Sequence, residues 1–358
     1  MPHAEVLDHT RLAHAELPLS DEHGAPVLAV LLQGTFAIDA RAQAVRALAV
    51  QPPVEIGGLA WPPISAGQAA EAAEIEWRFE PQTAFAKPGC DVLLHGHALA
   101  PQAGAMRTLV GFAIGGLKKC ALVHGPRHLL DGRRIVERGP IERVPLRYGL
   151  AFGGWDRRDP DPARHVCERR NPLGCGFRDP RAAIDRDVEL PPLEDPDAPI
   201  GRYGAAPSPA GFGFVGAHWL PRAQYAGTYD AAWQASRMPL LPLDFDCRYF
   251  LAASPGLQLP AAPADGERIT VLGTTPAGRV DFALPSLGTP LFHAHLRGRR
   301  RLTLKLRLDT VIVDTDAMCL TLLWRHPLPL RNGPHDLVAG EYHLPDPRAQ
   351  ALRRPREG

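Results

Sequence analysis

The stretch Arg301-Leu302-Thr303-Leu304-Lys305-Leu306-Arg307-Leu308 is the clearest secondary-structure signal in the chain. Its four leucines alternate with polar residues, and alternate side chains of a β-strand point to the same face of a sheet. The pattern predicts a strand with one face in the core and the other in water. The strand continues through Val311 and Val313 to the turn-like Asp314-Thr315-Asp316. An apolar run follows over Cys319 to Trp324, which predicts a hairpin.

Similar apolar runs separated by turn residues recur along the chain, whereas helical patterns are scarce. Residues 268–272 and 279–284 predict a second hairpin, and residues 27–37 and 44–50 predict another strand pair. The 34 glycines and 38 prolines are typical of a chain with many turns. We therefore expect a mainly β fold of antiparallel sheets, sandwich or barrel-like, with long irregular loops rich in Pro and Gly.

The same patterns suggest three parts of the chain. We expect an amino-terminal β layer over residues 1–85, a main β-rich domain over 86–325 and an arginine-rich carboxy-terminal tail over 326–358. Between Trp155 and Ala210, proline, glycine and charge are dense and apolar periodicity is missing. So long an irregular stretch is unusual in a compact domain unless it is functional or wraps a surface.

Composition excludes several classes of protein. The 358 residues include 40 Lys+Arg and 39 Asp+Glu, so the formal charge is +1 and a nucleic acid or an anionic membrane is not an expected partner. Apolar runs fall far short of the roughly 18 residues that a membrane-spanning helix needs. Acidic residues and histidines stand where a secretory signal has its apolar core, so we expect a cytoplasmic protein. Its six cysteines include no CxxC pair, and we expect no disulfide framework.

His95-Gly96-His97 is the first candidate for metal chemistry, because the two imidazoles share a face if the segment is extended. Two ligands do not make a site. A third would come from His124, His128, His165, His218 or a cysteine, none of which stands at a diagnostic spacing. We therefore predict no metal site, and we expect these histidines to be packed or exposed.

Asp244-Phe245-Asp246 is the candidate for catalysis. In an extended segment its two carboxylates would share a face, as glycoside hydrolysis or a divalent cation requires. Carboxylates in a segment flanked by proline are more often turn formers, and Asp314 and Asp316 are interpreted in the same way. The chain contains neither a GxSxG elbow, nor a phosphate-binding P-loop, nor an HExxH helix. We expect no catalytic residue, no cofactor and no enzymatic activity.

Several strings of unusual composition remain after these templates fail. The most specific are Asn171-Pro172-Leu173-Gly174-Cys175-Gly176-Phe177, Ala226-Gly227-Thr228-Tyr229-Asp230 followed by Trp233, and Pro242-Leu243-Asp244-Phe245-Asp246. Together with Lys87-Pro88, Asp91-Val92-Leu93, Phe152-Gly153-Gly154, His218-Trp219-Leu220-Pro221-Arg222 and Trp324-Arg325, they resemble the bacterial family of unknown function DUF2169. The resemblance covers about residues 87–325. Pro126 and Cys175 depart from it, standing where the family commonly has Asp and Arg.

The resemblance implies a role in type VI secretion, since members of this family are associated with PAAR and VgrG spike proteins and with toxins. It implies a non-enzymatic adaptor or chaperone that binds an effector and helps load it on the spike. The aromatic residues of the irregular region are the candidate anchors for such a partner, and ordinary packing is the alternative for each. They are Trp155, Trp219, Tyr229 and Trp233. The rival function is a carbohydrate-active hydrolase that uses Asp244 and Asp246.

Overall fold

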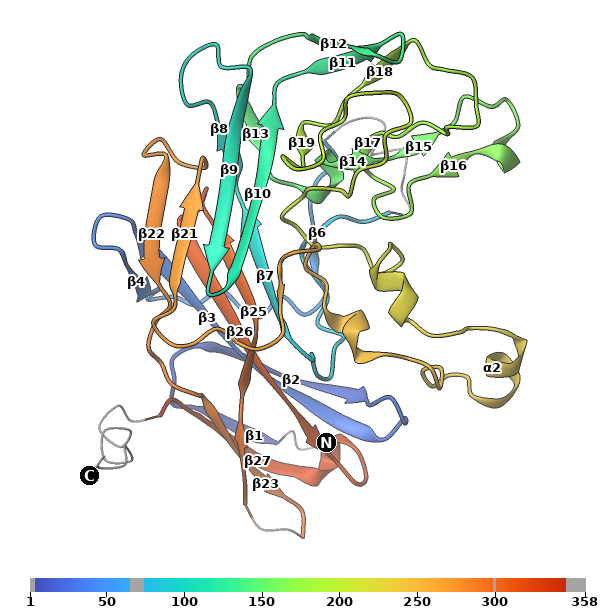
Figure 1. The fold of residues 1–358 in the computed structure, drawn as a ribbon. Coiled ribbons are helices and arrows are strands. Elements are labelled where there is room, and N and C mark those ends of the chain that lie inside the picture. Colours follow the sequence, from blue (N-terminus) through green and yellow to red (C-terminus); the bar gives the residue numbers. More distant parts are fainter. Residues whose placement is uncertain (1–3, 65–73, 299–300, 346–358) are drawn as a thin grey trace, which may run out of the picture.

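The computed structural model describes residues 4–64, 74–298 and 301–345, and it is mainly β, as the sequence predicts (Figure 1). The largest sheet has the strand order β2-β3-β26-β25-β7-β20, and β4 pairs with β3. Its neighbours are antiparallel except β25 and β7, which run parallel. The strands are β2 (Ala13–Ser20), β3 (Pro26–Asp39), β4 (Ala44–Ala47), β7 (Cys90–His95), β20 (Gln258–Leu259), β25 (Arg307–Asp314) and β26 (Cys319–Pro329).

A five-stranded antiparallel sheet packs against this sheet to form a sandwich (Figure 1). One apolar cluster joins the two sheets: Val92 and Val313 come from the first, and Phe112 and Phe282 from the second. No strand order in the described ranges closes a barrel, so the sandwich is the correct alternative. The strands, in order across the sheet, are β19 (Leu193–Glu194), β10 (Leu117–His124), β9 (Arg107–Ile114), β21 (Arg268–Leu272) and β22 (Arg279–Ala283).

A four-stranded sheet extends the same core at the lower end of Figure 1. Phe292 and Tyr342 from this sheet are fully buried in the cluster that joins the other two. The strand that begins the described chain, β1, runs parallel to the last strand, β27. The strands, in order, are β1 (Glu5–Asp8), β27 (Leu337–His343), β23 (Leu291–Leu296) and β24 (Leu302–Lys305).

The region from Trp155 to Ala210 contains only short strands and one 3-10 turn, which confirms the predicted irregular stretch. The small sheets around it are β12-β11-β18, β13-β8, β14-β17, β15-β16 and β5-β6. Their bounds are β5 (Leu59–Ala60), β6 (Trp77–Phe79), β8 (His97–Leu99), β11 (Arg127–Leu130), β12 (Arg134–Glu137), β13 (Arg143–Pro145), β14 (Phe152–Gly153), β15 (Trp155–Asp156), β16 (Val166–Cys167), β17 (Cys175–Gly176) and β18 (Asp187–Glu189). The helical elements are α2 (Ala231–Ser236), η1 (Tyr148–Leu150), η2 (Pro162–Arg164), η3 (Arg222–Tyr225), η4 (Cys247–Phe250) and η5 (Pro334–Asp336).

The three predicted strand pairs are present as β25-β26, β21-β22 and β3-β4. The stretch 301–308, however, is not one strand. It divides at Leu306 into β24 and β25, which belong to different sheets. Leu306 is fully buried at this crossing, where its amide donates to the Pro290 carbonyl (2.9 Å). Leu302 is 38% exposed, so the four leucines do not share one core face.

The sheets also cross the predicted domain boundaries. Strand β3 lies within residues 1–85, yet it pairs with β26 along the whole length of β26. The predicted boundary at 85/86 therefore does not separate two sheets. The predicted tail, 326–358, begins inside β26 and contains β27. Both differences arise because strand pairing joins segments that are distant in sequence.

No helix in the described part of the chain has the length and apolar character needed to cross a bilayer.

Candidate functional site

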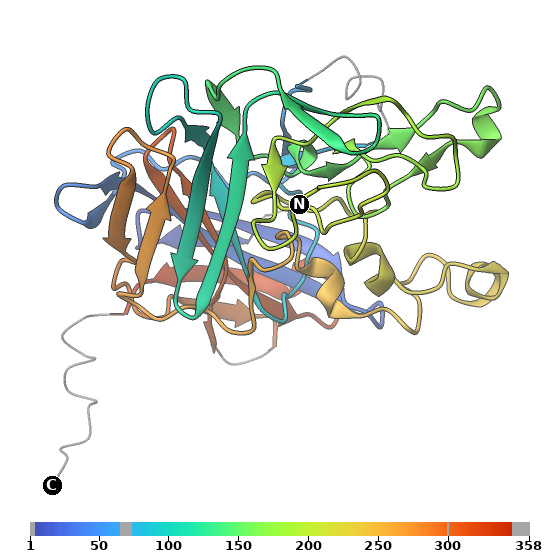
Figure 2. The same cartoon turned by 45° about the horizontal axis from the view of Figure 1, so that its top comes forward.

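Residues 226–246, here called the lobe, project from the sandwich beside the irregular region (Figures 1 and 2). The short helix α2 begins where the Asp230 side chain accepts a hydrogen bond from the Trp233 amide (2.8 Å). The Tyr229 ring packs edge-on against the Trp233 ring, with centroids 4.7 Å apart. Trp233 in turn donates from Nε1 to the Leu240 carbonyl (2.8 Å). These contacts give the lobe a fixed internal structure.

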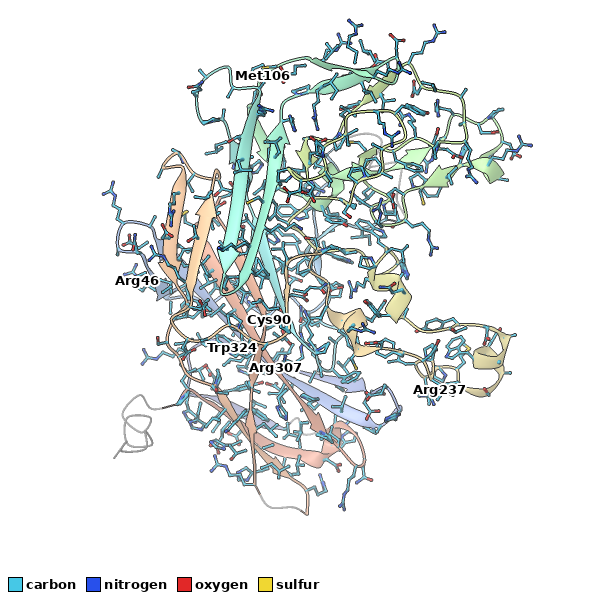
Figure 3. All side chains as sticks on the ribbon, in the orientation of Figure 1. Arg46, Cys90, Met106, Arg237, Arg307 and Trp324 are labelled. Atoms are coloured by element: carbon cyan, nitrogen blue, oxygen red, sulfur yellow. The ribbon has the colours of Figure 1, made fainter. Side chains whose placement is uncertain are left out.

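Side-chain bonds to the backbone hold the lobe closed. Asp244 accepts from both the amide (2.9 Å) and the hydroxyl (2.7 Å) of Thr228. Gly227 has φ +82°, and a Cβ there would lie 2.7 Å from Pro242, so this close approach requires glycine. Arg237, labelled in Figure 3, donates to the Glu22 carbonyl (2.8 Å) in the turn between β2 and β3. The lobe is thereby tied to the sandwich.

The lobe exposes large apolar side chains to water. Tyr229 is 53% exposed, Met238 60% and Leu243 85%. Single exposed apolar residues are common on protein surfaces, but three within one short projection are typical of a contact surface. This lobe is the candidate functional site of the described chain.

The structure brings together only two of the four predicted partner-binding residues. Tyr229 and Trp233 are neighbours in the lobe, whereas Trp155 lies in β15 with the Arg157 guanidinium 5.0 Å from its ring centre. Trp219 is 1% exposed, stacks on Tyr148 (6.2 Å between centroids) and donates to Glu74. Trp219 is therefore a core residue and is not accessible to a partner.

Asp244 and Asp246 occur in turns, as the sequence analysis favours. Hydrogen bonds from Thr228, first from its amide, lower the pKa of Asp244. Asp246 caps η4 by accepting from the Arg248 amide (2.8 Å). The Arg248 guanidinium also donates to it and lowers its pKa. Both carboxylates are thus engaged in closing local backbone structure.

His95 and His97 line a cavity of about 190 Å³ together with Trp61, Arg147 and Asp316. β7 ends at His95, Gly96 turns the chain with φ +143°, and β8 begins at His97. Burial lowers the pKa of His95 to about 4, and neither of its ring nitrogens has a hydrogen-bond partner in the described chain. His97 pairs with Asp316 through Nδ1 (2.6 Å).

Of the histidines considered as a third ligand, His218 is exposed and the other three have contacts elsewhere. His124 pairs with Glu194, His128 with Asp187, and His165 with the Asp159 carbonyl. Within the described ranges, His95 and His97 belong to no group of three potential ligands.

Most of the distinctive strings have architectural roles. Asn171 is fully buried, and its side-chain amide donates to the carbonyls of Tyr148 (2.8 Å), Ala151 and Phe152. A Cβ on Gly153 would lie 2.1 Å from the Asn171 carbonyl, so the two glycine-containing strings pack backbone against backbone. Phe152 and Gly153 of this string form strand β14, which pairs with β17, so the string has a structural role.

Buried ion pairs connect the remaining strings to the sandwich. These pairs leave little signal in the sequence, because the acidic and basic partners are mostly distant along the chain. Only Lys87 and Asp91, four residues apart, leave a local signal. The pairs are Lys87–Asp91 (2.7 Å), Arg325–Asp309 (2.7 Å), Arg147–Glu76 (2.6 Å), Arg127–Glu194 (3.0 Å) and Arg222–Glu80.

A family model described as "Uncharacterized protein conserved in bacteria (DUF2169)" matches residues 23–325 of the chain. The match includes the lobe, the irregular region and all of the strings discussed above. No curated protein and no solved structure matches the chain.

Proposed function

The chain belongs to the bacterial DUF2169 family, and on this premise we propose that it is a non-enzymatic cytoplasmic adaptor or chaperone. It binds a type VI secretion effector and helps load the effector on the PAAR or VgrG spike. The observation that carries the proposal is the projecting lobe, with Tyr229, Met238 and Leu243 exposed on it.

A partner gains affinity from such a surface in two ways. Removing a large apolar side chain from water contributes about 1.5–3 kcal/mol when its burial is complete. The hydrogen bonds of Asp230, Asp244 and Arg237 already fix the lobe, so little conformational entropy is lost when a partner binds. A rigid aromatic anchor at Tyr229 is typical of an interface hot spot.

The adaptor is preferred to the carbohydrate-active hydrolase for a structural reason. Hydrolysis by Asp244 and Asp246 would require carboxylates that face a substrate cleft. Each of these carboxylates instead accepts hydrogen bonds from nearby backbone amides. No specific observation favours the hydrolase.

The proposal is tested by co-purification with the effector encoded beside this gene. We expect Tyr229→Ala and Leu243→Ala to weaken the complex at least tenfold while leaving the melting temperature unchanged. Val50→Ala is the matched control, because Val50 is 85% exposed but lies outside the lobe. If both lobe variants bind the effector as well as wild type does, the lobe is not part of the interface. If no neighbouring gene product co-purifies with the chain, the adaptor function is contradicted.

A further inference from the structure

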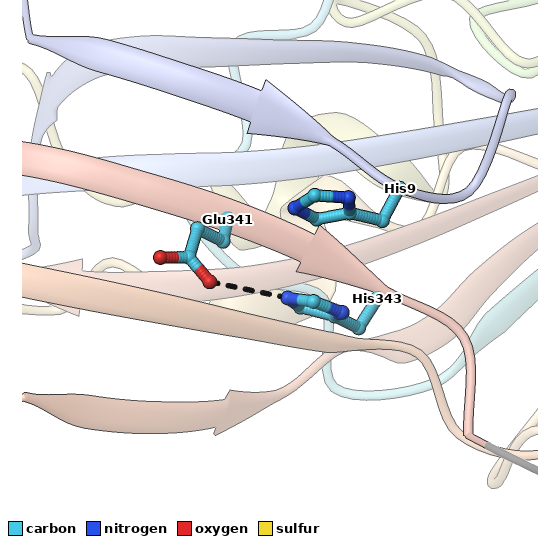
Figure 4. Close-up of side chains that lie close together, drawn as sticks. All are labelled: His9, Glu341 and His343. Carbon is cyan, nitrogen blue, oxygen red and sulfur yellow. Dashed lines mark hydrogen bonds and ion pairs between the residues drawn. The ribbon is translucent and has the colours of Figure 1, made fainter.

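We propose that His9, Glu341 and His343 form a zinc site that fastens strand β1 to the four-stranded sheet. Their potential ligand atoms all lie within 4.8 Å of one another. Figure 4 shows the three side chains gathered on one side of the sheet, with Glu341 directed at His343. The Glu341 Oε2 and His343 Nε2 atoms are 3.2 Å apart.

Strand pairing places these residues together. Glu341 and His343 are alternate residues of β27, so they share one face, while Tyr342 between them is fully buried on the other. β1 runs parallel to β27 with Asp8 opposite Tyr342. His9 follows directly, and its amide donates to the Tyr342 carbonyl (3.1 Å). The backbone therefore fixes all three positions before any metal binds.

The donor set suits zinc. Two imidazoles and one carboxylate are common zinc ligands, at about 2.0–2.2 Å from the metal, which sets ligand atoms of a tetrahedron about 3.3 Å apart. The Glu341–His343 pair already has this separation. The His9 ring stacks on the His343 ring with centroids 4.6 Å apart, so His9 must rotate to bring a nitrogen to the metal. His9 is exposed, and this rotation meets little packing.

Neighbouring groups adjust the site. His293 lies opposite Glu341 in the β23–β27 register, and its ring centroid is 5.0 Å from that of His343. The His293 Nδ1 atom lies 2.8 Å from the Thr303 hydroxyl and His293 is not one of the three grouped ligands, so the fourth position of a tetrahedron is left to water. Arg301 competes with the metal for Glu341, because its guanidinium donates to the same carboxylate oxygen (2.6 Å).

The site has a structural consequence. β1 is an edge strand of four residues, held on one side only. A metal that binds the folded but not the unfolded chain stabilises the folded chain by mass action. Zinc at this position would link the amino-terminal strand to the last strand of the sheet. The prediction of no metal site concerned His95 and His97, and the sequence carries no signal for the present site because His9 and His343 are near opposite ends of the chain.

The test uses the full chain, treated with a chelator and titrated with zinc chloride in a calorimeter. We expect one zinc per chain and a rise in melting temperature on zinc addition. His9→Ala and His343→Ala should each lower the affinity at least tenfold and remove the rise in melting temperature. His23→Ala is the matched control, since His23 is an exposed histidine beside an acidic residue outside the site.

Two further variants distinguish the loss of a zinc ligand from a loss of folding. Glu341→Gln keeps the side-chain shape but removes the charge, and should weaken zinc binding with the zinc-free melting temperature preserved. Arg301→Ala removes a competing cation and should tighten binding. The site is refuted if zinc does not bind, or if wild-type, His9→Ala and His343→Ala chains bind it with equal affinity.

Discussion

Asp91 is fully buried in β7, and its carboxylate connects three segments of the chain. It accepts from the Lys87 ammonium (2.7 Å) and from the amides of Ala252 (3.0 Å) and Ala253 (2.9 Å). Lys87 donates a further hydrogen bond to the Thr310 hydroxyl (3.1 Å), and its side chain is only 6% exposed. The carboxylate therefore neutralises a charge that cannot be solvated.

Replacing Asp91 with alanine should destabilise the fold strongly. The substitution leaves the Lys87 charge buried and unpaired, for which a loss of about 3–5 kcal/mol in the free energy of unfolding is expected. Urea denaturation measures it. Arg181→Ala breaks an exposed pair with Asp179 and should have a much smaller effect. Equal losses for the two variants would contradict the structural role of the buried pair.

His95 should make stability depend on pH. Burial lowers its pKa to about 4, with Arg78 adding to the effect and Asp314 opposing it. The unfolded chain, with a histidine pKa near 6.5, binds a proton before the folded chain does. Above pH 6.5 His95 is neutral in both states and does not reduce the free energy of unfolding. As the pH decreases from 6.5 to about 4, protonation of the unfolded chain lowers that free energy. This difference corresponds to a loss of about 3 kcal/mol.

The contribution is isolated by substitution. His95→Phe keeps an aromatic ring beside Trp61, Phe79 and Phe214 but cannot be protonated. Unfolding free energies measured from pH 7 to pH 4 should decline less steeply for His95→Phe than for wild type. The exposed His218 provides the control His218→Phe, which should follow the wild-type curve. A His95→Phe curve parallel to wild type would show that His95 titrates normally in the folded chain.

The burial of single aromatic residues could not be predicted from the sequence. Tyr229 and Trp219 are both aromatic residues in glycine-rich strings, yet one is half-exposed and the other buried. Trp219 fits because Gly216 lacks a side chain: a Cβ there would lie 2.7 Å from the indole ring. Such a contact depends on the folded backbone and has no signature in composition. The turn roles of Asp244 and Asp246, by contrast, follow from local chemistry and were predictable.

At the scale of elements, Asp244 should control the order of the lobe. Asp244→Ala removes both bonds to Thr228, so amide hydrogen exchange across 227–246 should become faster while the protection of β3 and β26 is unchanged. Asp265→Ala is the control. Asp265 accepts from the Gly288 amide (2.6 Å) in another exposed loop, and its loss should leave the lobe unaffected. Unchanged exchange in Asp244→Ala would mean that other contacts suffice to hold the lobe.

Elements with local alternation were predictable, and elements defined by distant contacts were not. The hairpins β21-β22 and β25-β26 join neighbouring segments through short turns, so pattern and turn chemistry suffice. The division of 301–308 into β24 and β25 depends on which sheet each half joins. β24 pairs with β23 and β25 with β26 and β7, and alternation alone does not distinguish these partners.

At the scale of the whole molecule, one apolar cluster unites three sheets. The predicted boundary at 85/86 does not follow the sheets, because β3 and β26, which lie on either side of it, are neighbours in one sheet. The predicted tail contains Tyr342, which is fully buried and donates to Glu16 (2.7 Å). Pairing between strands so far apart in sequence depends on how their side chains pack together in the folded chain, and local sequence patterns do not reveal it. The irregular region and the lobe lie beside this core (Figures 1 and 2).

The central claim, that the lobe binds an effector, is tested most directly by hydrogen exchange on the complex. The full chain is compared alone and bound to the effector encoded beside its gene, with exchange measured at every peptide. We predict that amides of residues 226–246 become protected on binding while the outer strands β22 and β4, which lie away from the lobe, do not change. Protection confined to other parts of the chain would contradict the account.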